Sequence, residues 1–550
     1  MNFSEKLPSY YKTGFNMFES GFPCLYTTKD NDLGTLILKL RHTTMEDRRV
    51  IFVDGRQIMC SNNWVRDNCH QMKSYKHWEY DMKSFIDFVI DHQTEKGFFL
   101  EFLKMLDEPH LPGDIPEECR IDFPEDNYAF MRLELEADVE YLVIESAINI
   151  YQVTGDDEWM KSILPKLEKA IDYCTSDEKR WSPEYRLVKR PFTIDTWDFA
   201  YNDGMARKID ESTPMSIMHG DNTGVYQAMM QLAWINKRFG NNEKAEKWQK
   251  RATELRENIN KYLWNGKYFI HQLHLNHKGA DDLESERLSL SNSYDMNRGV
   301  TTYEQNVKII SEYIERGEKV GAFAEWITLD PPYEDFPAWK NNILEKYTYV
   351  NGAIAPFVAG ELAKAAFRNG MERYGFSILK RIYDLYKKDG YLKFTYHPIE
   401  RDDYQSGPSG WGSAAILNAI DEGLAGILDT DVQYRTMRFA PCWPATEYDE
   451  LRYVTGYELG KVRIDTRYRL CDEGILYQLE CPSEEIDCHI YIPEGKECDY
   501  VTVNGEKISV ENVTIGESKY IDFKLSGFGY ERDGRGYAKN RIYKIEIYFK

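Results

Sequence analysis

Residues 136–174, EADVEYLVIESAINIYQVTGDDEWMKSILPKLEKAIDYC, decide the fold. Apolar residues recur in this stretch every three or four positions, which is the period of a helix that buries one face. The pattern breaks at Thr154-Gly155-Asp156, where glycine supplies the left-handed residue that ends a helix. We therefore predict a hairpin of two helices, the first rich in small and apolar residues and the second more charged.

The same design recurs twice further along the chain. Residues 222–264 break at Phe239-Gly240-Asn241, and residues 351–390 break at Arg368-Asn369-Gly370. Less regular helical stretches at 64–93, 293–318 and 410–428 bring the count to five or six units. Because a hairpin cannot bury its apolar face alone, the repeats predict a closed α/α toroid of six hairpins, with an open solenoid as the alternative.

The texture of the sequence changes near residue 430. The segments beyond it alternate apolar and polar residues, and Val503-Asn504-Gly505-Glu506 carries the signature of a hairpin turn. We predict an N-terminal cap segment with some β structure (1–60), the α/α toroid (61–428) and a C-terminal antiparallel β-sandwich (429–550). The strand-like run GTLILKL, residues 34–40, belongs to the cap segment.

Composition narrows the class of ligand. A formal charge of −22 disfavours nucleic acid and anionic membranes as partners, because both require a basic surface. Aromatic residues make up 14% of the chain and are rich in tyrosine, whose flat face and polar end suit sugar binding. No apolar run is long enough for a membrane span, and the ten cysteines include no C-x-x-C pair. We therefore expect a cytoplasmic protein with reduced thiols.

Cofactor and metal sites are not expected. The chain has no glycine fingerprint for nucleotide phosphates. His271, His274 and His277 recur every three residues, but no carboxylate or cysteine pattern completes a metal site there. These histidines are expected on a solvated loop or strand. In HGDNTG, residues 219–224, Asp221 or Asn222 is expected to cap the helix that follows.

Polar and aromatic residues gather in four stretches between predicted helices, which a toroid would bring to one end: WVRDN (64–68), KRPFTIDTWDFAYNDG (189–204), YTYVNGAIAPF (347–357) and YHPIERDDYQSGPSGWGSAA (396–415). Asp195 and Asp198 flank Trp197. Glycoside hydrolysis requires one protonated carboxyl beside the leaving oxygen and a second carboxylate that activates water. Because an apolar ring raises the pKa of a neighbouring carboxyl, Asp198 suits the acid role, although these residues could also be surface charges.

The sequence resembles the six-hairpin glycosidases, which include glucoamylases, trehalases, glycogen-debranching glucosidases and processing α-glucosidases. Trp64-Val65-Arg66-Asp67 is similar to a W-x-R-D segment in which Arg and Asp bind hydroxyls of the terminal sugar. TWDFA, residues 196–200, is similar to the trehalase stretch G-W-D-F-S, whose aspartate is the general acid. The resemblance thus implies Asp198 as the acid. Thr196 replaces the glycine of that stretch, which keeps Asp195 as a second candidate.

The same families place a general base glutamate two residues before a tyrosine, upstream of an F-G-W-S/T segment. DDYQSGPSGWGSAA, residues 402–415, resembles this arrangement and implies Asp402 as the base, with Glu400 and Asp403 as alternatives because an aspartate replaces the glutamate. YVNGAIAPF, residues 349–357, is similar to an N-G-x-x-x-P-F stretch that lines the sugar pocket, which implies a role for Asn351.

These observations predict an inverting, exo-acting and α-glucosidase-like glycoside hydrolase that releases a terminal sugar from an oligosaccharide or glycoside. A glycoside phosphorylase or an α-L-rhamnosidase on the same toroid is the alternative, as is a non-catalytic carbohydrate-binding protein. The acidic cluster at 400–403, with no phosphate-binding pattern beside it, favours hydrolysis. The predicted catalytic residues are Asp198, Asp402 and Glu400, and the predicted substrate-binding residues are Trp64, Arg66, Asp67, Trp197, Asn351 and Trp411.

Overall fold

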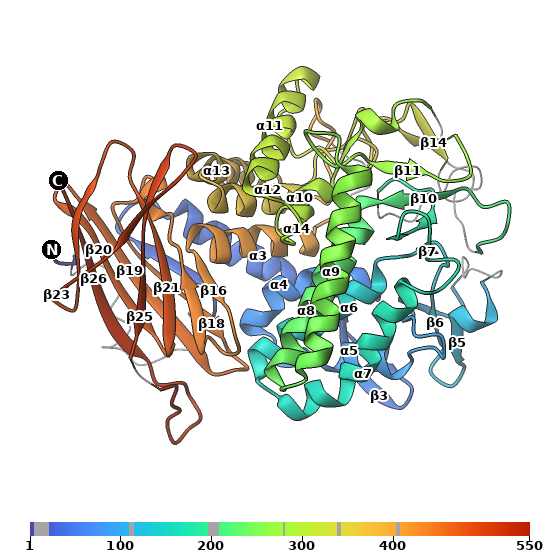
Figure 1. The fold of residues 1–550 in the computed structure, drawn as a ribbon, viewed down its shortest axis with the longest axis horizontal. Coiled ribbons are helices and arrows are strands. Elements are labelled where there is room, and N and C mark those ends of the chain that lie inside the picture. Colours follow the sequence, from blue (N-terminus) through green and yellow to red (C-terminus); the bar gives the residue numbers. More distant parts are fainter. Residues whose placement is uncertain are drawn as a thin grey trace.

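The computed structural model has a helical body and a body of β-strands, side by side (Figure 1). It describes residues 1–4, 21–108, 115–195, 208–278, 281–337, 343–402, 407–527 and 529–550. Among these residues, no helix is both long and apolar enough to cross a membrane.

Six helices form a closed inner ring in the helical body. Each of them packs on the next one in the chain, and the last packs on the first. The prediction of a closed toroid is therefore confirmed. The inner helices are α4 (Val65–Trp78), α6 (Val139–Thr154), α8 (His219–Arg238), α10 (Ser291–Asp295), α12 (Pro356–Arg368) and α14 (Gly410–Asn418).

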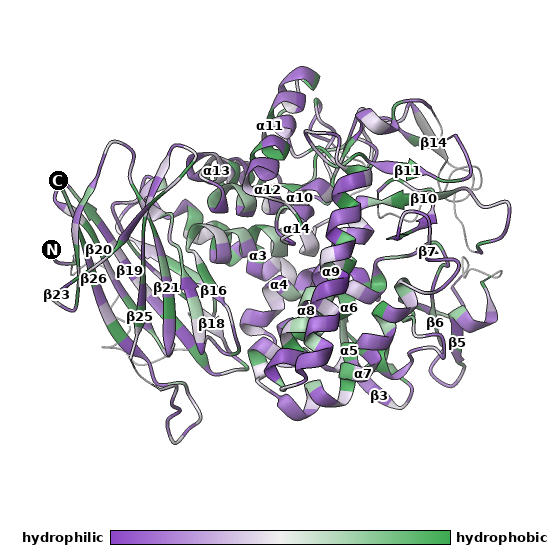
Figure 2. Ribbon diagram, viewed as in Figure 1, coloured by the Kyte–Doolittle hydropathy of each residue, from purple (hydrophilic) through white to green (hydrophobic). Residues whose placement is uncertain are grey.

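Six outer helices cover this ring. The amphipathic helix α9 buries Trp248, Leu255 and Ile259 and turns charged residues outward, whereas α6 is apolar on almost every side (Figure 2). The break predicted at Gly155 is the turn between α6 and α7, where this residue has a φ of 64°. The outer helices are α3 (Asp32–Glu46), α5 (Ser84–Asp91), α7 (Asp157–Cys174), α9 (Asn242–Leu263), α11 (Tyr303–Val320) and α13 (Glu372–Asp389).

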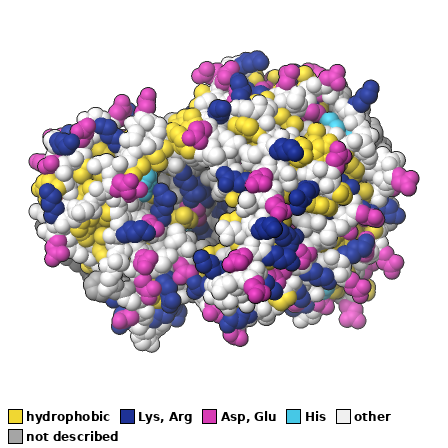
Figure 3. Space-filling model, viewed as in Figure 1, with side chains coloured by type: hydrophobic (Ala, Val, Ile, Leu, Met, Phe, Trp, Pro, Cys, Tyr) yellow, Lys and Arg dark blue, Asp and Glu magenta, His cyan; other side chains and the backbone are white. Residues whose placement is uncertain are grey.

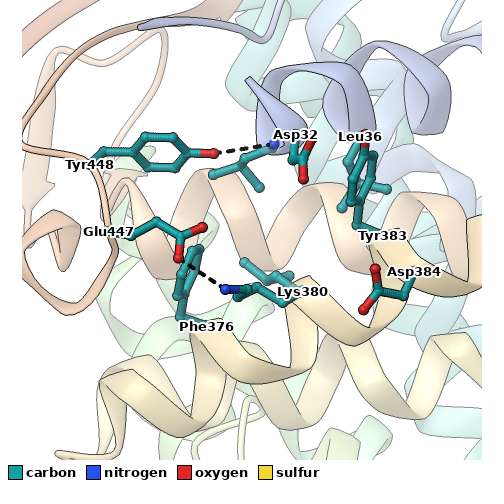
Figure 4. A pocket seen from close by; sticks show the side chains of 10 residues that line it. Asp32, Leu36, Phe376, Lys380, Tyr383, Asp384, Glu447 and Tyr448 are labelled. Carbon is teal, nitrogen blue, oxygen red and sulfur yellow. Dashed lines mark hydrogen bonds and ion pairs between the residues drawn. The ribbon is translucent and has the colours of Figure 1, made fainter. Parts of the chain in front are cut away.

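The outer helix α3 comes from the segment predicted as an N-terminal cap. It packs on α14 and α13. Figure 4 shows the start of α3 beside the ion pair between Lys380 and Glu447. The hydroxyl of Tyr448 accepts a hydrogen bond from the Leu33 amide at 3.4 Å. The strand prediction for residues 34–40 is wrong, because these residues lie inside α3, whose start is capped by Asn31. A short apolar run fits a strand and a buried helix equally well, so periodicity could not separate them.

Two packed sheets form the C-terminal body. The first has the strand order β16 (Ile427–Asp429), β17 (Thr436–Phe439), β21 (Glu485–Ile492), β25 (Ser518–Ser526) and β24 (Glu511–Ile515). All its pairings are antiparallel except the one between β17 and β21. The predicted antiparallel β-structure is thus confirmed, with one parallel pair.

The second sheet includes a strand from the N-terminal segment. Its order is β1 (Cys24–Thr27), β18 (Glu450–Tyr457), β19 (Val462–Cys471), β20 (Gly474–Cys481), β26 (Arg541–Phe549), β22 (Cys498–Val503) and β23 (Glu506–Ile508). The predicted turn at Asn504-Gly505 joins β22 to β23, and both residues have positive φ. Since β1 belongs to this sheet and α3 to the toroid, the N-terminal segment ties the two bodies together.

The sandwich covers one end of the toroid. At the C-terminal end of α4, the His77 ring nitrogen Nδ1 lies 3.0 Å from the carbonyl oxygen of Gly456 on β18. The short strands β7 (Trp181–Ser182), β10 (Met215–Met218) and β11 (Gln272–His274) lie at the opposite end (Figure 1). Figure 3 shows a hollow between the two bodies and a visible surface on which acidic and basic side chains are mixed. The N-terminal ends of the inner helices, with their loops, therefore face away from the sandwich.

Candidate active site

The described residues of the predicted site lie at the N-terminal ends of the inner helices. Trp64 and Arg66 begin α4, Asp195 contacts the first residue of α10, and Trp411 lies in the first turn of α14. The partial positive charge of a helix N-terminus stabilises nearby carboxylates. The described parts of the polar loops therefore lie at one end of the toroid.

Arg66 is bound by the carboxylates of residues distant in the sequence rather than by that of its neighbour Asp67. Its Nε lies 2.6 Å and one Nη 3.0 Å from the two carboxylate oxygens of Asp138, and it also pairs with Glu136 and, at 3.3 Å, with Glu101. Only a small part of Arg66 reaches solvent. Its Nε and one Nη are therefore already engaged by carboxylates, and the paired sugar clamp of Arg66 and Asp67 stays a prediction.

Asp67 and Trp64 have different surroundings. Burial raises the pKa of the Asp67 carboxyl to about 6, although the positive charge of Arg66 opposes this shift. Trp64 stacks on Phe102 with ring centroids 4.4 Å apart, and it is half-buried. A partly accessible indole beside a carboxyl that titrates near neutral pH suits the edge of a sugar site, so substrate binding by these two residues stays a prediction.

The charged network around Arg66 continues to the next inner helix. Arg190 lies 3.6 Å from Glu136 and 3.4 Å from Asp221, and all three side chains are buried. Burial raises the pKa of Asp221 to about 6, against the charge of Arg190. The predicted capping role of Asp221 or Asn222 is wrong, because α8 begins earlier, at His219, with no side-chain cap.

Asp195 is unsuited to the acid role that it was assigned as second candidate. Its carboxylate accepts hydrogen bonds from the amide and hydroxyl of Ser291, and its own amide donates to His271 Nε2 at 2.8 Å. Although burial acts to raise it, the pKa of Asp195 is lowered by the charge of His219 and by hydrogen bonds from Ser289 and Ser291. A carboxylate held in its ionised form cannot supply a proton near neutral pH. The predicted acid Asp198 and its neighbour Trp197 lie outside the described residues.

The histidines of residues 271–277 are not on a solvated face, which corrects that expectation. His271 is fully buried, and its Nδ1 lies 2.7 Å from a carboxylate oxygen of Glu284. His274 Nδ1 lies 3.0 Å from His277 Nε2. Among the described residues, no group of three or more His, Cys, Asp or Glu side chains is arranged to hold a metal ion. His271 supports the loop that contains Asp195, because it accepts a hydrogen bond from the Asp195 amide.

The two base candidates that the structure describes lie on an exposed loop before α14. Asp402 forms an ion pair with Lys393 at 2.7 Å, and 55% of its side chain is accessible. Glu400 is also exposed, and its amide donates to His397 Nδ1. The third candidate, Asp403, is outside the described residues. The loop joins a segment beside α12 to α14, so it borders the site, and the choice of base stays a prediction.

Asn351 stabilises a loop instead of facing a ligand. It is fully buried, and its amide nitrogen donates to the carbonyl oxygens of Tyr333 and Leu344, both at 3.0 Å. Its amide oxygen accepts a hydrogen bond from the Tyr333 amide at 2.9 Å. Both ends of the side chain are therefore occupied, and the geometry does not support the predicted sugar contact.

Trp411 lies on the axis of the toroid. Its indole stacks on His70 of α4, with centroids 4.0 Å apart and an interplanar angle of 10°. Its Nε1 donates to the hydroxyl of Tyr294 on α10 at 2.9 Å. Because α4 and α10 are opposite each other in the inner ring, these three side chains meet across its diameter. They therefore fill part of the axis of the ring.

Sequence reasoning missed the buried charges that hold this end together. Glu101, Glu136, Asp138 and Arg190 were not singled out, yet each contacts Arg66 or one of its partners. A signal was present in RLELEAD, residues 132–138, where four charged residues interrupt an apolar stretch. Charged residues that interrupt a buried run are paired or functional, because an isolated buried charge is too costly.

Comparison with known proteins agrees with this architecture. Residues 140–281, which include the second and third hairpins, match the family model of the bacterial α-L-rhamnosidase six-hairpin glycosidase domain. No curated protein matches the sequence.

Solved structures share the fold at low sequence identity. The GH78 family rhamnosidase of Bacillus sp. GL1 has a TM-score of 0.57 and 16% identity, over 86% of this chain and 43% of that chain. The α-L-rhamnosidase of Dictyoglomus thermophilum has a TM-score of 0.57 and 11% identity, over 96% of this chain and 50% of that one.

A third relative was solved with a sugar. The Streptomyces avermitilis α-L-rhamnosidase complexed with L-rhamnose has a TM-score of 0.56 and 12% identity, over 96% of this chain and 42% of that one. The chain thus spans half or less of the length of these relatives. The protein has the six-hairpin glycosidase fold with a C-terminal β-sandwich, and its second and third hairpins match the α-L-rhamnosidase domain of that class.

Proposed function

We propose that the protein is an inverting exo-glycosidase that removes a terminal sugar, with α-L-rhamnosides as its substrate class. The observation that carries this proposal is the match of residues 140–281 to the α-L-rhamnosidase domain, a segment that includes Arg190, Asp195, Asp198 and Asp221. The same match favours the rhamnosidase alternative over the α-glucosidase-like substrate preference that the short motifs suggested.

The geometry of the site supports an exo-acting enzyme. Trp411, His70 and Tyr294 meet across the ring. We expect them to close its axis, so that a sugar entering from the loop end would meet a floor. An enzyme of this shape receives only the end of a glycan. L-rhamnose has a methyl group where glucose has a hydroxymethyl group, and the aromatic side chains at the floor give this methyl an apolar surface.

The proposed chemistry uses two carboxyl groups. Asp198 protonates the leaving oxygen, and Asp402 or Glu400 removes a proton from the attacking water. An inverting enzyme requires room for that water, so the two carboxyls are expected roughly 6.5–9.5 Å apart. No metal or cofactor enters this scheme.

Aryl glycosides test the proposed reaction directly. We expect release of L-rhamnose from an aryl α-L-rhamnopyranoside, with the β-anomer formed first in a proton NMR time course. Release of glucose from the matching aryl α-D-glucopyranoside, but no rhamnose, would contradict the substrate class. Turnover that requires phosphate and yields a sugar phosphate would identify a phosphorylase, and binding without turnover would identify a carbohydrate-binding protein.

Substitution of the base candidates separates Asp402 from Glu400. We expect Asp402→Asn to lower kcat about 10²–10⁴-fold on good and poor leaving groups alike, because the base acts on water and not on the leaving group. Stability should hardly change, since exposed ion pairs contribute little. Lys393→Met is the control, because it breaks the same ion pair and keeps the carboxylate. If Asp402→Asn is as active as the wild type and Glu400→Gln is not, Glu400 is the base.

A further inference from the structure

A cleft of about 520 Å³ lies on the β-sandwich, next to the place where the toroid meets it. It is lined by the end of β18, the turn that leads to β19, the end of β20 and the segment before β26. In this lining, the amide of Glu458 donates a hydrogen bond to the carbonyl oxygen of His77 at the C-terminal end of α4. The volume is within the range of roughly 300–1,000 Å³ that is typical of small-molecule sites. Since the candidate active site is at the opposite end of the toroid, the proposed reaction does not use this cleft.

One wall of the cleft is a hairpin that is held in a fixed shape by hydrogen bonds. The carboxylate of Asp533 accepts hydrogen bonds from the amides of Arg535 and Tyr537, at 2.9 and 3.0 Å. Lys461, on the turn after β18, donates to the carbonyl oxygen of Arg535 at 3.1 Å. A segment that is already ordered loses little entropy when a ligand binds, so the hairpin presents Tyr537 at low cost.

Two tyrosines with unusually exposed rings are found at this cleft. Tyr537, which lines it, is 42% exposed, and Tyr80, which follows α4 on the toroid, is 59% exposed. Among the described residues, Tyr303 is the only other tyrosine with a comparable exposure, 37%. The pKa of Tyr80 is raised by burial and by the nearby Glu458 and Tyr537, which places the two rings near each other. A flat apolar face with a polar end is a surface on which a sugar ring can stack.

The charges around the cleft favour a ligand without net charge. Three acidic and three basic side chains line it, namely Glu458, Glu480, Asp533, Lys461, Arg463 and Arg535. Balanced charge of this kind gives no advantage to a polyanion or to a polycation.

Two of the carboxyls in the lining are half-buried without a cationic partner. No ion pair to Glu458 or Glu480 is found within the described part of the chain. Burial raises the pKa of Glu458 against the charge of Arg41, and it raises the pKa of Glu480 to about 7 against the effect of the neighbouring Asn540. Hydrogen bonds donated by a ligand stabilise the ionised form of such a carboxyl, and hydroxyl groups are donors of this kind.

We propose that the cleft is a second carbohydrate-binding site, which holds a neutral oligosaccharide away from the active site. A sugar ring stacks on Tyr80 or Tyr537, and its hydroxyls donate hydrogen bonds to the Glu458 carboxylate. A neutral ligand rich in hydroxyls fits all three observations, which are the exposed rings, the balanced charge and the carboxyls without a cationic partner. The inference goes beyond the proposed reaction and does not depend on it, because the cleft and the active site are at different ends of the toroid.

Replacement of the two exposed rings tests this site. In calorimetry with maltohexaose, cellohexaose and a neutral rhamnan oligosaccharide, we expect at least one of these sugars to bind the wild type. Tyr537→Ala and Tyr80→Ala should each weaken this binding about 10-fold, the effect of losing one stacking contact. Turnover of an aryl glycoside should be unchanged in both variants. Tyr303→Ala is the matched control, since it removes a similarly exposed ring from the start of α11 and should not affect binding.

The inference is overturned if none of these neutral oligosaccharides binds, or if the wild type and both tyrosine variants bind them equally well. Binding that is restricted to oligogalacturonate, as the acidic comparison, would overturn it as well. If a tyrosine variant does not fold, Glu458→Gln, which keeps the shape of the side chain and removes its charge, should weaken binding about 10-fold. A wild type that binds these sugars but cleaves no glycoside would contradict the proposed function and leave this inference standing.

Discussion

Asp198→Asn should lower the turnover of natural glycosides about 10²–10⁴-fold, because the amide keeps the shape of the side chain and removes the transferable proton. The loss should depend on the leaving group. Sugars linked through a poor leaving group need protonation and should suffer most, whereas aryl or fluoride leaving groups should be partly spared. Steady-state kinetics on a series of such substrates, with kcat and KM measured separately, show how strongly the turnover rate depends on the leaving group.

Two further substitutions control this experiment. Glu211→Gln removes an exposed carboxyl from the same part of the chain and should leave activity unchanged. Asp195→Asn alters a carboxylate that already accepts two hydrogen bonds from Ser291, so it should lower stability without the leaving-group dependence. If Asp195→Asn shows that dependence and Asp198→Asn does not, the acid has been assigned to the wrong residue.

Arg66→Met should destabilise the fold by about 3–5 kcal/mol, the usual result of removing one partner from a buried ion pair. Arg66 neutralises Glu136 and Asp138, which are buried, and lies 3.3 Å from Glu101. A residue that only binds substrate, the role predicted for Arg66 from the sequence, would instead give a loss of sugar binding in a largely intact fold. The structure changes this expectation, because the Arg66 guanidinium neutralises buried carboxylates and so contributes to the stability of the fold. Denaturant unfolding at pH 7 measures the effect.

The pH dependence of this variant gives a second check. Loss of Arg66 should raise the folded-state pKa of the carboxyls around it above their unfolded values. A group of this kind contributes stability below its unfolded pKa and loses that contribution as the pH rises through its folded pKa. The stability deficit of Arg66→Met should therefore shrink between pH 7 and pH 5. Arg66→Lys, which keeps the charge but not the fork, should be intermediate. Unchanged stability with weaker sugar binding would restore Arg66 to the sugar clamp.

The sequence by itself determined the architecture, because periodicity is a local property. The breaks at Gly155, Gly240 and Gly370 locate three hairpin turns, and alternation after residue 430 marks the strands. Helix α3 was not predicted from the sequence, because its apolar run is short and its partners, α13 and α14, are more than three hundred residues away in the chain. A helix of this kind is recognisable only when the surface that it covers is known.

Tertiary structure alone decided which polar residues are free for a ligand. Arg66 and Asn351 have side chains of the types that bind sugars. In the folded protein, however, Glu136 and Asp138 bind the Arg66 guanidinium, and backbone carbonyls accept the hydrogen bonds of the Asn351 amide. His70 drew no attention in the sequence, because nothing nearby shows that it meets Trp411 and Tyr294 on the axis of the ring. The sequence states what a side chain can bind, whereas packing determines whether its hydrogen bonds are already used.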